Sequence, residues 1–368
     1  MTRERLLLVA GGTGGHIFPA LSFGAWLSEA HPEVDVAYMC GAREMERDIY
    51  RSAGIEPFVL SASGSPLGAP KGRRIARLRE LFASFREAKN YLRDFSPGMC
   101  VAFGGYVSAP ALLFAWMGKR SVIAHEQNAY AGRITRLAAH IGVPVASGWE
   151  VCEPLRQGIY THTGIPVRRF RRMEKRDAWR ELGIPAEMSA RPTVLAMTGS
   201  LGSDNIRNVL SSVCRDEKMR GWAFLVVGAD GDVPERLADN LFLLPKRWDA
   251  SPFFSAADIA ITRGGASTLF EVAVMDLPGI VIPWRGAASD HQMKNARCFA
   301  ADPRHAIWDE KTEQIDDLMK KLNDLYRSFP MKPGAIDKKM YNAAENACER
   351  LWNLLISFKK GEIHVEGR

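Results

Sequence analysis

Short apolar runs that alternate with helix-forming segments constrain the fold of this chain more than any other feature. They lie at residues 6–10, 34–40, 99–105, 121–126, 193–200, 223–228, 259–262 and 279–284. Short runs that are apolar on both faces are typical of strands buried in a parallel sheet, with the intervening helices as crossovers. The sequence therefore predicts an α/β fold built on parallel sheets.

The first run ends in a glycine turn. It reads "GGTGGHIFPA", with Gly11, Gly12, Gly14 and Gly15 before His16, and a helix is expected from about Pro19. A turn without Cβ atoms lets a ligand or another backbone approach closely, and the N-terminus of a helix attracts anions. The turn matches neither a dinucleotide fingerprint, which needs glycine where Ile17 stands, nor a phosphate-binding loop ending in G-K-[ST]. A tight turn that binds nothing is the alternative.

The length of 368 residues favours two domains. A charged, helix-forming stretch at 162–185 separates two series of strands, so we place an N-terminal domain at 1–162 and a C-terminal domain at 163–339. The segment 340–360 has helical periodicity and is expected to pack back on the first domain. The second series opens as the first does, with a strand that runs into a turn of small residues. Two similar halves that face each other would form a cleft.

The net charge and the cysteine pattern indicate which kinds of partner and which cellular compartment to expect. The net charge of +7 and the isoelectric point near 9.1 suggest acidic partners, such as nucleotides, phosphates, anionic lipid or nucleic acid. Six scattered cysteines without a C-x-x-C pair argue against a disulfide framework and a zinc site, and fit a reducing cytosol. The longest apolar stretch, 109–118, is far shorter than the ~20 residues of a membrane span. We expect a soluble protein without a metal or another cofactor.

Two further stretches of the first half carry polar groups at strand ends. "FGGYVSAP" at 103–110 is a second glycine turn, followed by Tyr106 and Ser108. "HEQN" at 125–128 places four polar side chains where a parallel sheet forms its ligand pocket. A solvated loop is the alternative for the second stretch.

Two stretches of the second half have the same character. Gly264, Gly265 and Ala266 open a predicted helix that carries Glu271 in its first turn, where a carboxylate favours the helix dipole and accepts hydrogen bonds from a ribose diol. Simple capping is the alternative for Glu271. "SDHQMKNA" at 289–296 gathers polar side chains suited to a sugar.

The order of these stretches resembles that of the MurG family, the peptidoglycan N-acetylglucosaminyltransferases. The matching blocks are "GGTGGHIFPA", "FGGYVSAP", "HEQNAYAG", "GIPVR", "TGSLGS", "TRGGASTLFEVA" and "SDHQMKNA", which span residues 6 to about 300. The resemblance implies the GT-B fold, two Rossmann-like domains with the active cleft between them. It also implies an inverting transfer of N-acetylglucosamine (GlcNAc) from UDP to the C4 hydroxyl of the muramoyl sugar of lipid I, which gives lipid II.

The resemblance also implies roles for individual residues. On the donor side these are Glu271 for the ribose, the backbone near Gly265 and Ala266 for the nucleotide, Ser200 and Arg168 for the diphosphate, Asn128 for the acetamido group, His291, Gln292 and Asn295 for the sugar hydroxyls, and the first glycine turn with Thr13, Gly14 and Gly15. On the acceptor side they are Tyr106, Glu126 and His16, with His16 as the general base or a ligand of the lipid diphosphate. The chain departs from the family pattern at Ile165, Leu201 and Ser203, and has His291 as the first member of the amide pair.

A basic amphipathic segment at 71–95 is the expected membrane contact. Its apolar stripe is Ile75, Leu78, Phe82 and Phe85, its flanking cations include Arg73, Arg74 and Arg77, and Trp116 at 112–118 would extend it. Packing into the core is the alternative for this stripe. We expect a peripheral protein on the anionic, cytoplasmic face of the inner membrane, with UDP-GlcNAc and lipid I as partners and no nucleic acid.

Three other functions stay open on the sequence. A different GT-B transferase acting on a lipid such as diacylglycerol would share the nucleotide half, although "HEQNA" and "GGY" favour the MurG family. A dinucleotide-dependent oxidoreductase would need the missing third glycine. A basic nucleic-acid binder would fit the charge, but the aromatic residues are not interleaved with basic ones on strands.

Overall fold

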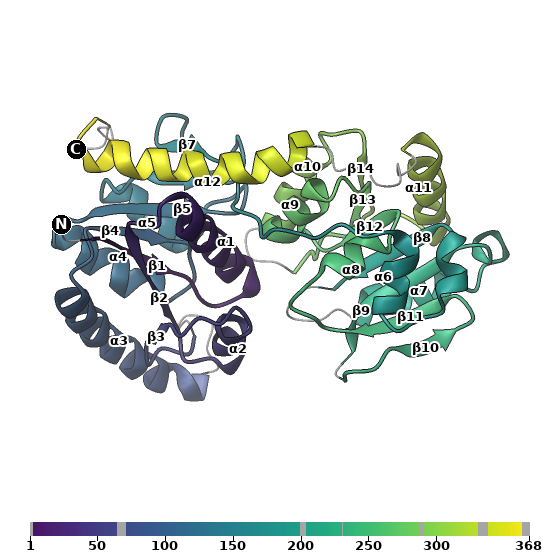
Figure 1. The fold of residues 1–368 in the computed structure, drawn as a ribbon, viewed down its shortest axis with the longest axis horizontal. Coiled ribbons are helices and arrows are strands. Elements are labelled where there is room, and N and C mark those ends of the chain that lie inside the picture. The colour runs from purple at the N-terminus through teal and green to yellow at the C-terminus, as the bar shows by residue number, and fades with distance from the viewer. Residues whose placement is uncertain are drawn as a thin grey trace. The chain divides into compact units, whose positions relative to one another are not determined.

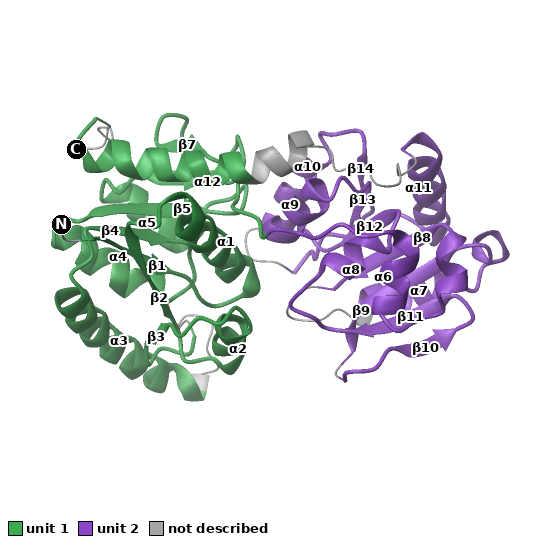
Figure 2. Ribbon diagram, viewed as in Figure 1, with its two compact units in different colours: residues 1–168, 343–368 green, residues 169–342 purple. Residues whose placement is uncertain are grey.

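The computed structural model describes residues 3–64, 71–198, 204–229, 231–286, 290–329 and 338–362. The chain divides into two compact units (Figure 2). Unit 1 comprises Met1–Arg168 and Ala343–Arg368, and unit 2 comprises Arg169–Asn342. The division between the units therefore follows Arg168, whereas the sequence predicts it after residue 162.

Unit 1 is built on a seven-stranded sheet (Figure 1). Its strands are β1 (Glu4–Val9), β2 (Val34–Cys40), β3 (Phe58–Val59), β4 (Met99–Ala102), β5 (Ser121–Glu126), β6 (Val145–Ser147) and β7 (Tyr160–His162). They lie in the order β3-β2-β1-β4-β5-β6-β7, and each neighbouring pair is parallel. The strand order reverses between β1 and β4, and the carboxyl ends of strands at such a switch point are where open α/β sheets bind ligands.

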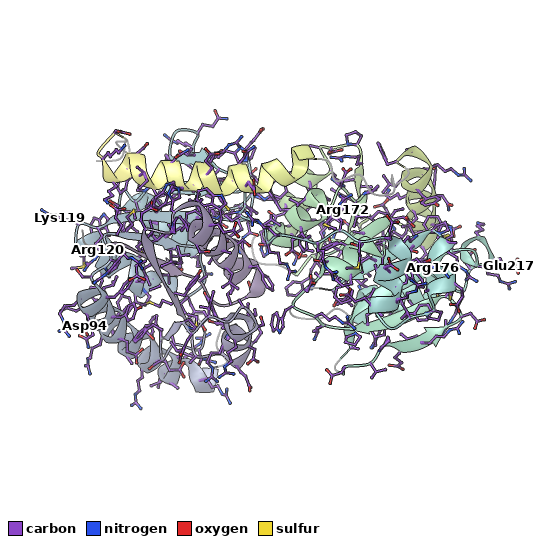
Figure 3. All side chains as sticks on the ribbon, viewed as in Figure 1. Asp94, Lys119, Arg120, Arg172, Arg176 and Glu217 are labelled. Atoms are coloured by element: carbon purple, nitrogen blue, oxygen red, sulfur yellow. The ribbon has the colours of Figure 1, made fainter. Side chains whose placement is uncertain are left out.

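Helices cover both faces of this sheet. On one face lie α1 (Gly14–Ala30), α2 (Glu44–Ser52) and the described part of α12 (Lys338–Lys359). On the other lie α3 (Arg74–Phe95), which follows the short 3₁₀ helix η2 (Lys71–Arg73), α4 (Ser108–Met117) and α5 (Arg133–His140). Arg120, labelled in Figure 3, donates to the carbonyl oxygens of Pro97 and Leu92 at 2.9 and 2.8 Å, and so ties the end of α3 to the turn before β5.

The C-terminal helix α12 belongs to unit 1 from Ala343 on, although it is the last element of the chain (Figure 2). Its buried Cys348, Leu351 and Leu355 share a core cluster with side chains of β1, α1 and β4. The ring of Trp352 lies 4.5 Å from that of His31 at the end of α1.

Apart from one added edge strand, unit 2 repeats the order of the first six strands of unit 1. Its strands are β8 (Thr193–Met197), β9 (Ala223–Ala229), β10 (Glu235–Ala238), β11 (Leu241–Pro245), β12 (Ile259–Thr262), β13 (Gly279–Val281) and β14 (His305–Ile307). They lie in the order β10-β11-β9-β8-β12-β13-β14. Only the edge strand β10 runs antiparallel among the described strands, a departure from the parallel sheet that the sequence predicts.

The helices of unit 2 are mostly short. They are α6 (Lys175–Glu181), η3 (Ala186–Ala190), α7 (Asp204–Val213), η4 (Glu217–Met219), α8 (Ser251–Ser255), α9 (Ala266–Val274), α10 (His291–Phe299) and α11 (Ile315–Ser328). Side chains of α7 and α11 pack on one face of the sheet, and Trp179 of α6 packs edge-on against Phe242 of β11 on the other. The strand order reverses between β8 and β12, so the loops after these strands are the second place where a ligand is expected.

The α/β fold with parallel-dominated sheets is thus confirmed. All six cysteines are described and none forms a disulfide, and burial raises the pKa of Cys40, Cys100 and Cys152 to about 12. No helix among the described residues combines the length and apolarity that a membrane span requires.

Candidate functional site

The first glycine turn is followed directly by α1. The helix begins at Gly14 and not near Pro19, which lies inside it, so Gly14, Gly15 and His16 form its first turn. Thr13 is the extended N-cap residue, with φ −149°. The first turn is fully described and contains no acidic residue. No carboxylate of the first turn itself therefore offsets the positive dipole end of α1, as suits an anionic ligand.

The two glycine turns of unit 1 pack against each other. Gly105 has φ +81°, and a Cβ atom there would lie 2.1 Å from the carbonyl oxygen of Gly11. A Cβ atom on Gly104 would lie 2.9 Å from Nδ1 of His16. At these positions glycine is required by a neighbouring backbone and ring. At Gly105 the close neighbour is the backbone of the first glycine turn.

Tyr106, expected on the acceptor side, is fixed by groups that the sequence did not single out. Its hydroxyl donates to Oε1 of Glu46 at 2.6 Å, and Oε2 of this fully buried carboxylate accepts from the backbone of Gly41 at 2.8 Å. Burial, together with Glu46, raises the pKa of Tyr106. Arg43 lies 5.2 Å from the centre of the tyrosine ring and donates to the carbonyl of Gly12 at 3.0 Å. These contacts hold the two glycine turns in register.

His16 meets the "HEQN" block through Gln127. Nδ1 of His16 lies 2.6 Å from Oε1 of Gln127, and Nε2 of Gln127 lies 2.9 Å from Nδ1 of His125. His125 is buried, which lowers its pKa to about 4. His16 itself is partly exposed. The structure thus brings together side chains from the ends of β1 and β5 that are far apart in sequence.

Glu126, also expected on the acceptor side, is buried and fully engaged. Its carboxylate accepts from the backbone and side-chain amides of Asn128, both at 3.0 Å, from the backbone of Gly132 at 2.8 Å, and from Oγ1 of Thr135 at 2.6 Å. These bonds position Asn128 and the beginning of α5. Glu126 therefore acts on its neighbours and does not present its carboxylate to solvent.

Arg168 and Ile165 lie in the "GIPVR" block at the end of unit 1. The guanidinium of Arg168 stacks 4.5 Å from the ring of Phe18, on the first turns of α1. Ile165, where the family has asparagine, is fully buried against Gly148, whose Cβ would lie 2.5 Å from Cγ1 of the isoleucine. The departure at Ile165 fills apolar space in this chain.

In unit 2 the helix α9 begins at Ala266, with Gly265 as its N-cap residue. The sequence predicts that Glu271 lies in the first turn of this helix. Glu271 is the sixth residue of α9, so it lies in the second turn. This position removes helix capping as the reason for the carboxylate. Glu271 is buried, with 5% of its surface exposed. A Cβ atom on Gly265 would meet no described atom within 4 Å, which leaves room for a ligand beside the backbone.

The polar residues of α10 hold the turn before α9. Oε1 of Gln292 accepts from the backbone of Gly264 at 3.2 Å and of Trp284 at 2.9 Å. Nδ2 of Asn295, which is fully buried, donates to the carbonyl of Gly264 at 2.8 Å. The role expected of both amides was to bind sugar hydroxyls, but in this structure they bind backbone. His291, the first residue of α10, is partly exposed.

Some of the expected groups are not described by the structure. Ser200, Leu201 and Ser203 lie outside the described residues. Among the described residues no three His, Cys, Asp or Glu side chains are grouped to hold a metal ion. A surface pocket of about 260 Å³ lies between α7 and the β10–β11 hairpin, and none of the predicted site residues lines it. We place one candidate set of ligand loops in unit 1, after β1, β4 and β5, and a second in unit 2, after β12 and β13.

Comparison with known proteins agrees with both halves of the chain. Residues 6–145 match the glycosyltransferase family 28 N-terminal domain, and residues 193–350 match the glycosyltransferase family 28 C-terminal domain. The UDP-N-acetylglucosamine--N-acetylmuramyl-(pentapeptide) pyrophosphoryl-undecaprenol N-acetylglucosamine transferase of Moorella thermoacetica is 32% identical, over 80% of this chain and 83% of the relative. The enzyme of the same name from Acetivibrio thermocellus is 25% identical over 97% of this chain and 99% of the relative.

The chain belongs to the MurG family. Solved structures agree on the fold. The crystal structure of Acinetobacter baumannii MurG aligns with a TM-score of 0.62 and 22% identity, over 97% of this chain and 99% of that chain. A glycosyltransferase of kitacinnamycin aligns with a TM-score of 0.65 and 14% identity, over the same shares. The GT-B fold that the resemblance implies is confirmed.

Seen as a MurG-family site, the structure adds residues that the sequence reasoning missed. Glu46 and Arg43 lie in the charged stretch 43–48, and Arg263 directly precedes Gly264, but none of the three is among the residues that the sequence singled out. Arg263 donates to the carbonyl of Ile282 at 3.1 Å and lies 3.6 Å from Glu310, and its burial lowers its pKa. A buried charge pairs with a residue far away along the chain, so only the fold reveals it.

Proposed function

We propose that this MurG-family chain transfers GlcNAc from UDP-GlcNAc to the C4 hydroxyl of the N-acetylmuramyl sugar of lipid I and so forms lipid II. The observation that carries the proposal is the match to a relative named for this reaction over 97% of this chain and 99% of the relative. The chain is thus a UDP-GlcNAc-dependent glycosyltransferase that acts on an undecaprenyl-diphosphate-linked acceptor.

The donor contacts belong to the loops around α9. The carboxylate of Glu271 would accept hydrogen bonds from the ribose diol, and the backbone at Gly265 and Ala266 would lie against the nucleotide. Open space at Gly265 and the two amides that brace Gly264 support this assignment. His291 would contact the sugar.

The acceptor contacts belong to the loops of unit 1. The His16 imidazole would take the proton of the C4 hydroxyl while the oxygen of this hydroxyl bonds to C1 of GlcNAc. The bond from C1 to the β-phosphate oxygen breaks, and its electron pair leaves with UDP, so the configuration at C1 inverts. Preorganised donors stabilise the negative charge of a leaving diphosphate. The first turn of α1 and Arg168 can supply them in unit 1, and Ser200 is assigned the same role in unit 2.

The surface of α3 is proposed to bind the membrane. Ile75, Leu78 and Phe82 are 67%, 44% and 74% exposed, so the core-packing alternative does not hold for them. Phe85 differs, because it is only partly exposed and its ring meets Phe114 edge-on at 6.0 Å. Trp116 on the neighbouring α4 is 41% exposed.

Cations surround these apolar side chains. Arg73, Arg74 and Arg79 are exposed, while Arg77 is half-buried and pairs with Glu80 at 3.0 Å. Exposed apolar side chains flanked by arginines suit the interface of an anionic bilayer. We call Arg73, Arg74, Ile75, Arg77, Leu78, Arg79, Phe82 and Trp116 the α3 patch. It would hold the protein on the cytoplasmic face of the inner membrane, where the lipid acceptor lies.

Ligand-dependent melting tests the donor assignment and separates the alternatives. UDP and UDP-GlcNAc should raise the melting temperature, because a ligand at 100 times its Kd adds about 2.7 kcal/mol to the free energy of unfolding. NAD and an oligonucleotide should not raise it. Glu271→Ala should abolish most of the shift with UDP. Glu217→Ala, on the exposed Glu217 labelled in Figure 3, should not affect it. A shift with NAD and none with UDP would contradict the proposal.

A further inference from the structure

A chain of hydrogen bonds leads from His16 into the interior of unit 1. It runs from Nδ1 of His16 to Oε1 of Gln127 at 2.6 Å, from Nε2 of Gln127 to Nδ1 of His125 at 2.9 Å, and from Nε2 of His125 to the carbonyl oxygen of Gly164 at 3.0 Å. The same Nε2 of Gln127 donates to the main-chain oxygen of His125 at 3.0 Å. His125 and Gln127 are 1% and 2% exposed.

The far end of this chain fixes the direction of every bond in it. The carbonyl of Gly164 can only accept, so Nε2 of His125 carries a proton. Burial lowers the pKa of His125 to about 4, so the ring is neutral near pH 7 and its Nδ1 carries no proton. That nitrogen therefore accepts from Gln127, whose amide nitrogen must face it. The main-chain oxygen of His125, another pure acceptor, demands the same orientation of the amide.

The orientation of Gln127 then decides the protonation of His16. Its carbonyl oxygen is turned to Nδ1 of His16, and an oxygen without a hydrogen can only accept. Nδ1 of His16 must donate, which leaves Nε2 of a neutral His16 with a lone pair. Which ring nitrogen carries the proton is set by the hydrogen bond that the other nitrogen makes.

We propose that Gln127 and His125 are positioning residues that hold His16 in the tautomer with its proton on Nδ1 and its lone pair on Nε2. The proposal deepens the proposed function, on which its catalytic meaning rests. A lone pair on Nε2 can accept the proton of an attacking hydroxyl, and it cannot donate to a diphosphate. Of the two roles left open for His16, the structure therefore favours the general base.

The anchor of this chain is built into the fold. Gly164 has φ +83°, and a Cβ atom there would lie 3.1 Å from Cβ of Ala347 in α12. Oγ1 of Thr163 also donates to the carbonyl of Gly164, at 3.1 Å. The C-terminal helix thus packs behind the residue that begins the series of hydrogen bonds.

Nitrogen NMR of the full-length chain, with ¹⁵N-labelled histidine rings, tests the tautomer without any substrate. His16 is assigned by comparison with His16→Gln, and spectra are recorded at about pH 8, where an ordinary histidine is neutral. We expect a protonated Nδ1 and an unprotonated Nε2 in His16. In Gln127→Met, which keeps the length of the side chain and removes its three hydrogen bonds, this preference should be lost. A proton on Nε2 of His16 in the unaltered chain would overturn the proposal, whatever reaction the protein catalyses.

Kinetics with matched variants tests the consequence for the reaction. Gln127→Met should lower kcat about 100-fold, within the range of general-base contributions, with the KM for UDP-GlcNAc unchanged. His125→Asn keeps an amide oxygen that can accept from Gln127, whereas His125→Leu does not. We therefore expect His125→Asn to retain at least about ten times the kcat of His125→Leu, at equal melting temperature. Equal losses of kcat in the two His125 variants, or an unchanged kcat in folded Gln127→Met, would overturn the positioning role of Gln127 and His125.

Discussion

Gly265 offers a direct way to probe the donor side at the scale of a single residue. Its φ of −76° is accessible to alanine, and a methyl group would meet no described atom within 4 Å. Gly265→Ala should therefore fold with a loss of at most about 1 kcal/mol, the usual range for a cap residue. The methyl group would occupy the space assigned to the nucleotide, so we expect the KM for UDP-GlcNAc to rise about 10-fold or more.

Gly221→Ala is the matched control, because Cβ at Gly221 also meets no described atom within 4 Å and no ligand is assigned there. Steady-state kinetics at saturating acceptor measures both variants. If the KM for UDP-GlcNAc changes equally little in both variants, the nucleotide does not lie beside Gly265.

His305 predicts how acid affects stability. Burial lowers its pKa from 6.5 to about 4, and its Nδ1 has no hydrogen-bond partner among the described residues. Between these two values the unfolded chain holds a proton that the folded chain does not, so stability falls as the pH decreases from about 6.5 to about 4, by about 1.4 kcal/mol per unit.

Replacement of this ring should flatten the acid side of the stability curve. His305→Phe keeps the stack on Phe299, whose ring centre lies 3.7 Å away, and removes the titration. Urea unfolding at about pH 7 and about pH 5 should show a loss smaller by about 2 kcal/mol than in the unaltered chain. The buried His125 leaves a residual loss of the same sign in both. Identical losses would contradict the account of His305.

Residue types at the site could be predicted from the sequence better than their roles. Glycine turns and polar clusters at strand ends mark the loops that carry Gly265, His16 and Gln127. The same signal does not tell a side chain that faces a ligand from one that braces a loop. Asn295 and Glu126 carry an amide and a carboxylate at the expected positions, yet both are buried. Asn295 donates to a backbone carbonyl, and Glu126 accepts from a backbone N–H. That distinction depends on tertiary packing.

At the scale of elements, α3 carries the membrane prediction. Replacement of Arg73, Arg74 and Arg79 with glutamate should weaken binding to anionic vesicles about 100-fold, since each basic residue near such a surface contributes about 1 kcal/mol. Binding by the unaltered chain should weaken with salt. Arg77 is left in place because its ion pair with Glu80 belongs to the fold.

The same change of charge in unit 2 is the control. Arg176, labelled in Figure 3, Arg215 and Arg220 are exposed and lie on no surface assigned to the membrane. The α3 variant should lose activity on acceptor in vesicles and keep it on a short-tailed soluble acceptor, and the control should keep both. Loss on both acceptors in the α3 variant would mean that α3 serves the fold or the site.

Element boundaries show what local sequence could not supply. Pro19 suggested the start of α1, but the helix begins at Gly14, because proline is also tolerated where the helix can bend or lose one hydrogen bond. Glu271 was expected in the first turn of its helix but lies in the second, since helix ends are the least certain part of a pattern. The antiparallel β10 has no apolar run to predict it, because most of this edge strand is exposed.

At the scale of the whole molecule, each unit has one sheet with its own set of ligand loops, and without the antiparallel β10 the strand order of unit 2 matches that of the first six strands of unit 1. This repetition could be predicted because both series of strands open with an apolar run that ends in a turn of small residues. The return of α12 to unit 1 has a clear physical reason, since its apolar side chains complete the core beside β1 and α1.

The most direct test of the central claim is UDP release from UDP-GlcNAc by the purified chain, with and without a lipid I analogue. Transfer to the acceptor predicts that UDP release is slow alone, rises steeply with the analogue, and yields one β-linked disaccharide product for each UDP. UDP release that is independent of the analogue, or none in its presence, would contradict the account.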